Sequence, residues 1–358
     1  MKLMAFALQL LASFFSLLPL KNRIAFLSRQ SSKLSLDYKL LIKELERSIT
    51  PDQIVIKVSN PETKAGLLTF AKNTITQLYY ARTSRVVIID GYIPAVSIPK
   101  KDPRITVIQL WHSLGAIKKF GYQSLDTPAG RTRKDAEAAH MHENYDYVIA
   151  GGPGAIDAYS EAFNYPEEQI IPLGLPRIDY LLDPNPQSER RKKVASIKRH
   201  NDFLLNGNRN IVYAPTLRKG RGYENWLTEA LYALSEKCDK AHGSAYNLIV
   251  AGHPLDLGFD KNLLDHYPQL HFIPGTSTID LLEIADEVVS DYSAIIFEAG
   301  LLGKKLSYYL PDLELYSNSP GLNLDPEEIT PSFVQDYLGC PQYGVTKKLA
   351  GFILEKLI

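Results

Sequence analysis

Short apolar runs alternate with longer helical stretches along the first half of the chain. Each run is rich in β-branched or aromatic residues, and together they cover 23–28, 53–59, 84–90, 105–111 and 145–151. Apolar residues at helical spacing fill the stretches between them, for example 37–49 and 61–81. Strands that alternate with helices in this way predict a parallel sheet covered by helices.

The same alternation restarts in the second half. Strand-like runs cover 210–216, 246–254, 271–275, 287–293 and 305–311, and helical stretches cover 223–243, 278–285 and 294–303. Between the halves, 181–209 holds prolines, a basic block and an Asn/Gly cluster. We therefore expect an α/β fold of two Rossmann-like, doubly wound domains that face a cleft, with 21–180 and 210–358 joined by a linker at 181–209.

The amino-terminal segment 1–20 is apolar with one polar stripe. Small and polar residues recur at helical spacing, at Lys2, Ala5, Gln9, Ser13 and Ser16. A signal peptide, a transmembrane helix and an interfacial helix are the alternatives. No small-x-small cleavage site precedes the first strand, and the segment is short for a span. We expect an apolar, amphipathic helix that lies on a membrane surface, with burial in the protein as the alternative.

The composition argues against a nucleic-acid-binding protein and against a metal site built from cysteines. Lys+Arg 40 balances Asp+Glu 40, so the chain has no electrostatic footprint for nucleic acid. The two cysteines, Cys238 and Cys340, belong to no metal-binding pattern and are expected to be reduced thiols.

Polar residues gather where the predicted strands end, which is where open α/β sheets bind ligands. In the first domain these are His112, Ser113, Gly115 and Arg177. In the second domain they are Thr216, Arg218, His253, Asp291, Ser293 and Glu298. Arginine and helix amino termini bind phosphate, and a histidine near neutrality can move a proton. The combination predicts a site for a phosphate ester.

Each of these residues also has a structural explanation. Ser293 stands where an N-cap of the helix over 294–303 belongs, His253 could close a turn, and Arg177 could pair with Asp179. Because the clusters recur at several strand ends of both domains, we favour a binding site.

Several common site motifs are missing from the sequence. No GxGxxG follows the first strand, and there is no P-loop, no GxSxG elbow and no DxD pair at a strand end. His140 and Glu143 share one side of a helix, but no second ligand cluster accompanies them, so a zinc site is not expected. We expect no tightly bound cofactor and leave a need for free Mg²⁺ open.

Taken together, these stretches resemble the CDP-glycerol glycerophosphotransferase family of teichoic acid primases and polymerases. The matching pieces run in family order between about residues 105 and 310, and are LWHSLGAIKKFG, RTRKDAEAAHMHENYDYVIAGG, GLPRIDYLL, VYAPTLRKG, GHPLD and TIDLLEIADEVVSDYSAIIFEAGLLGKK. The resemblance implies a glycosyltransferase-B-like fold, peripheral attachment to the cytoplasmic face of the cell membrane, and transfer of glycerol phosphate from CDP-glycerol to a lipid-linked acceptor.

The resemblance also implies roles for individual residues. His112 matches the family's first histidine, which is taken as the general base, and His253 matches the second. Phosphate and nucleotide contacts map onto Arg177, Thr216, Arg218, Ser293 and Glu298. The chain departs from the family at Ser-Leu-Gly after His112 and at Ala294, which leaves the alditol and the acceptor open.

In this interpretation His112 removes a proton from the acceptor hydroxyl, which attacks the β-phosphorus of CDP-glycerol and releases CMP. His253, Arg177, Arg218 and the start of the helix over 294–303 would stabilise the phosphate charge. Glu298 would accept hydrogen bonds from the ribose.

Other interpretations stay open at this stage. CDP-ribitol or a nucleotide sugar could be the donor, and a non-catalytic partner in envelope assembly is a different class of function. Lys118 and Lys119 could steer an anionic acceptor, could face acidic lipid headgroups or could simply be solvated. A homo-oligomer and the number of units added are not decided by the sequence.

Overall fold

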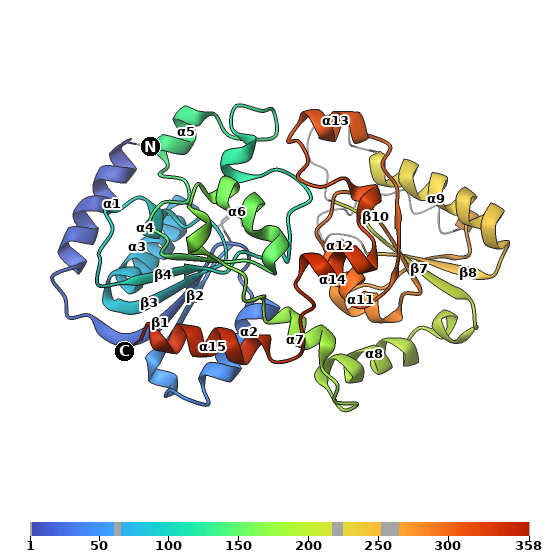
Figure 1. Cartoon of the computed structure of the whole chain (residues 1–358), viewed down its shortest axis with the longest axis horizontal. Helices are drawn as coiled ribbons and strands as arrows, with labels where there is room; N and C mark the ends of the chain where they lie inside the picture. The colour runs from blue at the N-terminus through green and yellow to red at the C-terminus, as the bar shows by residue number, and fades with distance from the viewer. Residues whose placement is uncertain (1, 61–65, 217–224, 252–264, 358) are drawn as a thin grey trace. The chain divides into compact units, whose positions relative to one another are not determined.

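The computed structural model describes residues 2–60, 66–216, 225–251 and 265–357. The chain forms two compact units (Figure 1). The first unit comprises Met1–Tyr180, Glu314–Asn323 and Tyr337–Ile358, and the second comprises Leu181–Leu313 and Leu324–Asp336. Each unit contains one parallel sheet, so the expected α/β class is confirmed.

The first unit is built on a 6-stranded sheet in the order β2-β1-β3-β4-β5-β6. Its strands are β1 (Lys21–Ser28), β2 (Ile54–Val58), β3 (Ser84–Ile89), β4 (Thr106–Gln109), β5 (Tyr147–Ile149) and β6 (Ile170–Ile171). The central strands are apolar because helices cover both faces, and β1 is buried from Arg23 to Ser28. The short β6 follows no strong β-rich run and was not expected from the sequence.

Helices of the first unit cover this sheet (Figure 1). They are α1 (Lys2–Phe15), α2 (Leu36–Leu45), α3 (Leu67–Thr83), α4 (Pro94–Ser97), α5 (Arg133–Ala138), α6 (Ile156–Phe163) and α15 (Val345–Glu355). Ser35 starts α2 by accepting a hydrogen bond from the Tyr38 backbone N–H, as an N-cap does. The chain leaves the first unit within α7 (Arg177–Leu182) and returns in α13 (Leu313–Asn318).

The carboxyl-terminal segment belongs to the first unit, which corrects the expected domain 210–358. α15 packs against α2, and its residues Leu349 and Ile353 are buried. The Asp179 carboxylate accepts hydrogen bonds from the backbone N–H groups of Gly344 (2.7 Å), Val345 (3.0 Å) and Thr346 (2.8 Å). This carboxylate fixes the start of α15 because the first N–H groups of a helix lack partners within the helix.

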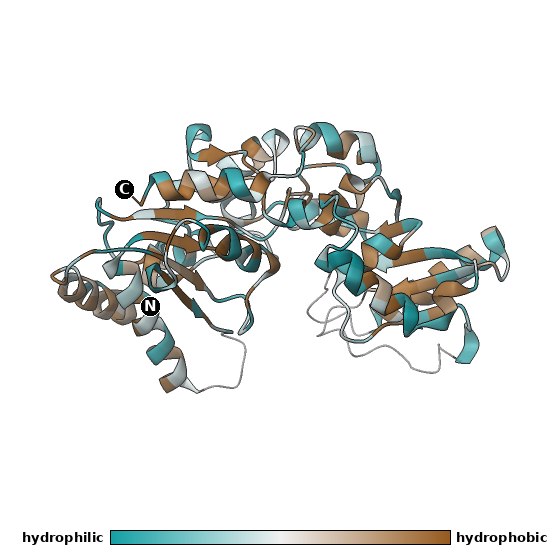
Figure 2. Ribbon diagram, turned by 90° about the horizontal axis from the view of Figure 1, so that it is seen from below, coloured by the Kyte–Doolittle hydropathy of each residue, from teal (hydrophilic) through white to brown (hydrophobic). Residues whose placement is uncertain are grey.

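The second unit is built on a 5-stranded sheet in the order β11-β10-β7-β8-β9. Its strands are β7 (Arg209–Ala214), β8 (Tyr246–Val250), β9 (Leu270–Phe272), β10 (Glu287–Ser290) and β11 (Lys305–Tyr308). One apolar core lies on each face of this sheet, and Figure 2 shows the hydrophobic strands between more hydrophilic helices. The described helices are α8 (Glu189–Arg199), α9 (Trp226–His242), α11 (Thr278–Ile284), α12 (Ile295–Leu301) and α14 (Pro331–Tyr337).

Residues 181–209 are part of the second unit, which corrects their assignment as a linker. Helix α8 packs on α11, and Val194 of α8 joins a core of the sheet. The buried Arg190 guanidinium forms an ion pair with Glu283 of α11. The basic block looked like a solvated linker because its two core-packed apolar residues, Val194 and Ile197, and its buried Arg190 are spread among exposed charges.

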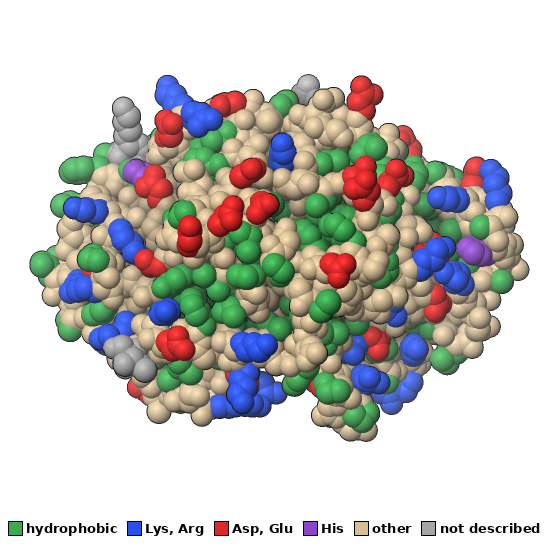
Figure 3. Space-filling view, viewed as in Figure 1, with side chains coloured by type: hydrophobic (Ala, Val, Ile, Leu, Met, Phe, Trp, Pro, Cys, Tyr) green, Lys and Arg blue, Asp and Glu red, His purple; other side chains and the backbone are tan. Residues whose placement is uncertain are grey.

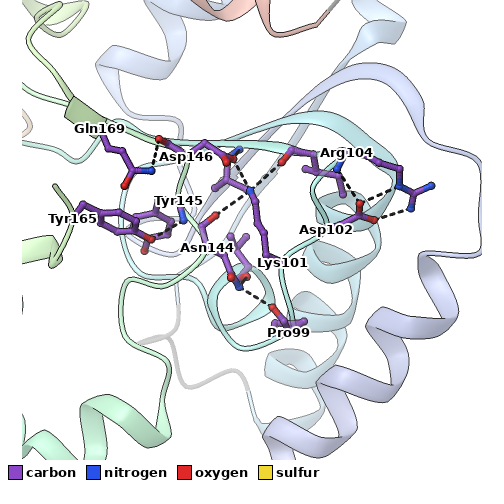
Figure 4. A network of polar contacts seen from close by, with 12 residues as sticks. Pro99, Lys101, Asp102, Arg104, Asn144, Tyr145, Asp146, Tyr165 and Gln169 are labelled. Carbon is purple, nitrogen blue, oxygen red and sulfur yellow. Dashed lines mark hydrogen bonds and ion pairs between the residues drawn. The ribbon is translucent and has the colours of Figure 1, made fainter. Parts of the chain in front are cut away.

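A polar network supports the amino-terminal ends of β4 and β5 (Figure 4). The Lys101 ammonium donates to an Asp146 carboxylate oxygen (2.5 Å) and to the Ile105 carbonyl (3.0 Å). The same Asp146 oxygen accepts from the Val107 backbone N–H (2.7 Å), so the pair joins the loop before β4 to the start of β5. These groups lie at the opposite end of the strands from the polar residues expected to bind substrate.

The amino-terminal helix α1 has a packed face and an exposed face. Leu8 and Ala12 are buried, and the Phe15 ring contacts the Tyr79 ring of α3 at 5.5 Å between centroids. The Gln9 side chain accepts a hydrogen bond from the Lys100 backbone N–H (2.7 Å). Large apolar side chains on the other face, Leu3, Phe6, Leu10 and Phe14, are 62% to 82% exposed, and Leu17 just after the helix is 82% exposed.

Figure 3 shows hydrophobic side chains that protrude along the edge of the first unit where Figure 1 places α1. The helix is 14 residues long. Among the residues that the structure describes, no helix combines the length and the apolar character needed to cross a bilayer.

Candidate active site

Three neighbouring strands of the first unit end in polar side chains. β1 ends at Ser28, β3 is followed by Asp90, and β4 is followed by His112. Because the strands are parallel, these three residues lie along the same edge of the sheet. This edge is where sheets of this type bind ligands.

A strained turn after β4 positions His112. Trp111 adopts a positive φ of 56°, which is uncommon for a bulky residue. The Gln109 side chain holds the turn by accepting from the Trp111 backbone N–H (2.9 Å) and donating to the Gly91 carbonyl (3.2 Å). The Trp111 ring stacks on Phe120 at 5.0 Å and lies 4.1 Å from the His112 ring. The strain is therefore maintained by packing, as is common at functional sites.

The His112 ring has one nitrogen fixed by the protein. Its Nδ1 lies 3.0 Å from the Asp90 backbone carbonyl, and because a carbonyl only accepts, Nδ1 carries the proton in this contact. The other nitrogen, Nε2, is then an acceptor in the neutral ring, and the side chain is exposed to solvent. The pKa of His112 is lowered by desolvation among surrounding protein atoms and by Arg177, against the opposing effects of the Asp90 carbonyl and Asp37. A neutral imidazole whose Nε2 is unprotonated can accept a proton near neutral pH.

Asp90 is a buried carboxyl group that the sequence did not single out. Its side chain is 4% exposed, and its Oδ1 atom has no hydrogen-bond partner among the described residues. Burial is the main cause that raises the pKa of Asp90 to about 7, and the nearby Asp37 acts in the same direction. Hydrogen bonds from Ser28 and from the backbone N–H of Asp90 act in the opposite direction. The sequence feature that could have indicated Asp90 is a charged residue directly after the four consecutive apolar residues of a strand.

The raised pKa of Asp90 predicts a pH-dependent stability that Asp90→Asn removes. The folded state keeps this proton up to about pH 7, whereas the unfolded chain releases it near pH 4, so stability falls as pH rises between these values. Between pH 5 and pH 8 this group lowers the free energy of unfolding by about 3 kcal/mol. Urea unfolding at both pH values should show a flatter dependence for the variant. An equally steep loss in both proteins would contradict the assignment.

Arg177 is held by a partner that the sequence did not indicate. Its backbone N–H and its Nε donate to the two carboxylate oxygens of Asp37, at 2.8 Å and 3.0 Å. Asp37 lies in the first turn of α2 and is 3% exposed. The alternative pairing of Arg177 with Asp179 is wrong, because Asp179 binds the start of α15. Asp37 therefore fixes the orientation of the Arg177 guanidinium.

Ser113 and Gly115 form the turn that follows His112. The Ser113 hydroxyl donates to the Gly115 carbonyl, and the Gly115 backbone N–H lies 3.3 Å from the same hydroxyl oxygen. The Ser113 carbonyl accepts from the Tyr159 hydroxyl (2.7 Å). These contacts are those of a turn, so a substrate role for the two residues stays a prediction.

Lys118 and Lys119 lie against another part of the same unit. Lys118 forms a backbone bridge with Leu322, and the Lys119 backbone N–H donates to the Gly321 carbonyl (2.9 Å). The Lys118 ammonium lies 5.8 Å from the centre of the Tyr316 ring. The contacts anchor the segment 314–323, which returns to the first unit from the second.

The second unit brings Thr216 and Asp291 together at the carboxyl ends of β7 and β10. The Asp291 side chain is fully buried and accepts from the Thr216 backbone N–H (2.8 Å). Ser293 does not cap the next helix: α12 starts at Ile295 with Ala294 at its N-cap position, and no side chain caps it. The structural explanation of Ser293 as an N-cap is therefore wrong.

The remaining predicted residues of the second unit are Glu298, Arg218 and His253. Glu298 lies within α12 and is 2% exposed. Arg218 and His253 lie outside the described residues. The expected convergence of Arg218, His253, Ser293 and Glu298 in one pocket therefore stays a prediction.

Metal-ligand geometry is not found in the described part of the chain, where no group of three or more His, Cys, Asp or Glu residues could hold an ion. His140 Nδ1 lies 2.9 Å from a Glu143 carboxylate oxygen, as an exposed pair on one side of a turn. Cys238 and Cys340 are free thiols.

A model of a known protein family matches nearly the whole chain. Residues 10–336 match the model of the CDP-Glycerol:Poly(glycerophosphate) glycerophosphotransferases. A teichoic acid ribitol-phosphate primase from Bacillus spizizenii is 29% identical over 303 residues, which cover 84% of this chain and 76% of the relative. A teichoic acid glycerol-phosphate primase from Bacillus subtilis is 28% identical over 254 residues, which cover 69% and 61%.

Solved structures show the same fold. The wall teichoic acid polymerase TagF superposes with a TM-score of 0.68 at 19% identity, over 97% of this chain and 93% of that chain. UDP-GlcNAc 2-epimerase from Neisseria meningitidis superposes with a TM-score of 0.59 at 16% identity, over 93% and 100%. The match of the family model extends over far more than half of the residues, and it includes His112, Arg177 and Asp291. The chain therefore belongs to the CDP-glycerol:poly(glycerophosphate) glycerophosphotransferase family.

Proposed function

We propose that this protein transfers glycerol phosphate from CDP-glycerol to a hydroxyl group of a lipid-linked teichoic acid acceptor and releases CMP. The observation that carries the proposal is the His112 ring, whose Nδ1–H is directed at the Asp90 carbonyl so that Nε2 is the accepting nitrogen. Membership of the family supplies the reaction type.

In the proposed mechanism His112 Nε2 removes the proton of the acceptor hydroxyl. The oxygen then attacks the β-phosphorus of CDP-glycerol, the bond from that phosphorus to the bridging oxygen breaks, and CMP leaves. Orientation and charge stabilisation supply most of the rate enhancement in such a transfer. Arg177, which Asp37 orients, would contact a phosphate of the reacting groups.

The second unit would bind the CDP-alditol. Thr216, Asp291 and Ser293 follow β7 and β10 on one edge of its sheet, and Ser293 Oγ makes no hydrogen bond to any residue the structure describes. Arg218 and His253 are proposed to meet the diphosphate, and Glu298 the ribose. The proposal includes no tightly bound metal, and activity with and without EDTA tests a need for free Mg²⁺.

A membrane surface is the proposed place of action. The acceptor carries a lipid, and the exposed face of α1 presents four large apolar side chains at helical spacing, followed by Leu17 just after the helix. Two exposed lysines lie near this helix: Lys21 follows it in sequence, and the Lys100 backbone N–H contacts Gln9 of the helix. Both would face acidic lipid headgroups. We propose peripheral attachment to the cytoplasmic face of the cell membrane.

CDP-ribitol is the second candidate donor. The ribitol-phosphate primase matches 84% of this chain, compared with 69% for the glycerol-phosphate primase. The two donors differ in the length of the alditol, and no described residue distinguishes them.

A donor panel tests the proposal. The protein is incubated with CDP-glycerol, CDP-ribitol or a UDP-sugar, together with a synthetic lipid-linked disaccharide, and the products are identified by mass spectrometry. Release of CMP with addition of glycerol phosphate is the expected result. Addition of ribitol phosphate would select the second candidate, release of UDP would indicate glycosyl transfer, and no turnover with any donor would favour a non-catalytic role.

A further inference from the structure

The indole ring of Trp111 lies against the ring that is proposed to take the proton. The centres of the Trp111 and His112 rings are 4.1 Å apart, and the ring planes are inclined by 33°. Rings that meet edge-on have more widely separated centres, as Trp111 and Phe163 do at 5.2 Å and 89°. The imidazole of His112 therefore lies over the face of the indole.

This contact accompanies the strained backbone of Trp111. In an extended chain the side chains of consecutive residues point to opposite sides. The positive φ of 56° at Trp111 interrupts the extended chain after β4, and the rings of Trp111 and His112 stack on each other instead. A bulky residue keeps such a φ only where its surroundings impose it, and strain of this kind is concentrated at functional sites.

Aromatic residues hold the indole in this place. The Phe120 ring stacks on it at 5.0 Å, and the rings of Phe163 and His142 meet it nearly at right angles, at 5.2 Å and 6.0 Å. Burial lowers the pKa of His142 to about 3, and Arg131 acts in the same direction. His142 is therefore neutral at physiological pH, and it does not compete with His112 as a cation beside the indole.

The charged groups around His112 give its cationic form little support. Desolvation lowers the pKa of His112 and Arg177 acts in the same direction, whereas the Asp90 carbonyl and Asp37 oppose them. The Asp37 carboxylate is bound to the Arg177 guanidinium, so these two charges largely offset each other. The Asp90 carboxyl keeps its proton up to about pH 7 and supplies no negative charge below that pH. A proton on Nε2 therefore needs a stabilising group other than a carboxylate.

An aromatic face can stabilise a cation without a negative charge. The π electrons of a ring attract a cation that lies over them, and the attraction is strongest for the indole of tryptophan. During the proposed transfer the acceptor proton moves to Nε2 while Nδ1 keeps its own proton, so the His112 ring becomes an imidazolium. Because this charge arises only as the proton moves, a group that stabilises it raises the rate rather than the affinity for substrate.

We propose that the Trp111 indole stabilises the imidazolium form of His112 and thereby speeds the removal of the acceptor proton. Trp111 is a positioning residue in this role, because it acts through His112 rather than on the substrate. The inference rests on the proposed function, in which His112 is the base. It adds an electron-rich ring to the carbonyl that fixes the Nδ1 proton.

Fluorinated tryptophan tests the proposal without a large change of shape. The chain has two tryptophans, Trp111 and Trp226, so Trp226→Phe confines the analogue to position 111. Fluorine withdraws electrons from the ring face and weakens its attraction for a cation. In an NMR titration of this protein, His112 should bind its proton about 3- to 10-fold more weakly with tetrafluorotryptophan than with tryptophan. The His112 signal is identified by its absence from His112→Ala.

The kinetics of transfer should follow the titration. Loss of the interaction lowers the pKa of His112, so the acid limb of kcat/KM should move to lower pH and kcat should fall by up to the same factor. Trp111→Phe keeps a weaker aromatic face and should keep part of the effect, whereas Trp111→Leu should lose it. His140 is the internal control, because it pairs with Glu143 in the same unit, and its titration should not depend on the analogue.

The titration needs no substrate, so it separates this proposal from the proposed function. Equal proton binding by His112 with tryptophan and with the fluorinated analogue would overturn the role of Trp111 and leave the proposed function standing. Weaker proton binding with an unchanged kcat would also overturn it, because the charge on the ring would then not limit transfer. If proton binding weakens with fluorination but no donor is turned over, the interaction of Trp111 with the imidazolium is supported and the proposed function fails.

Discussion

Replacement of His112 by alanine is expected to lower kcat by about 10²- to 10⁴-fold, which is the usual contribution of a positioned general base. The ring is held through its Nδ1–H to the Asp90 carbonyl, so alanine removes the proton acceptor without disturbing the backbone that supports it. Affinity for CDP-glycerol should be largely kept, because the donor is proposed to bind residues of the second unit.

The pH dependence gives a second measure of the same group. A base must be unprotonated, and the pKa of His112 is lowered, so the acid limb of kcat/KM should lie below the ordinary histidine value of about 6.5. His140→Ala is the control, since His140 is paired with Glu143 in the same unit. Near-wild-type turnover in a folded His112→Ala protein would remove His112 from the mechanism.

Substitution of Phe6, Leu10 and Phe14 by serine is expected to release the protein from membranes. These side chains are 68%, 63% and 62% exposed, so the substitutions remove little packing within the folded unit. Burial of each in lipid contributes about 1.5 kcal/mol or more, so the triple variant should partition into lipid about 10³-fold more weakly. Flotation with anionic lipid vesicles measures the effect, and the thermal midpoint should stay close to that of the wild type.

The structure makes these substitutions a sharper test than deletion of residues 1–20. Leu8 and Ala12 are buried and Gln9 binds Lys100, so a deletion would also uncover α3 and would confuse loss of folding with loss of binding. Leu205→Ser is the control, because Leu205 is 66% exposed on the second unit. If the triple variant floats with vesicles as well as the wild type does, the exposed face of α1 is not a membrane contact.

The sheets could be predicted from the sequence because their central strands are buried on both faces. The four consecutive apolar residues 86–89 of β3 are all buried, which separates this run from the amphipathic helices beside it. Parallel strands also place their carboxyl ends on one edge, so His112 could be assigned to a site before its surroundings were known. The short β6, with only Ile170 and Ile171, carries too few residues for a pattern.

Contacts between distant segments could not be predicted in the same way. Asp37 lies in the first turn of α2, where an acidic residue is common and indicates no partner, and Arg177 lies 140 residues further along the chain. α15 has an ordinary amphipathic pattern, which does not say which sheet it covers.

The return of the chain to the first unit has a consequence for its synthesis. Residues 181–313 leave the ribosome between the first two of the three segments of that unit, and the side of α2 that α15 covers stays open to water until Val345–Glu355 has been made. Domains usually fold in the order of their translation. Here the unit that begins first is completed last. The backbone N–H group of Val345, which donates to Asp179, is made long after Asp179 itself. A stalled nascent chain that ends before α15 should therefore hold a protease-resistant second unit beside a first unit that is still cleaved.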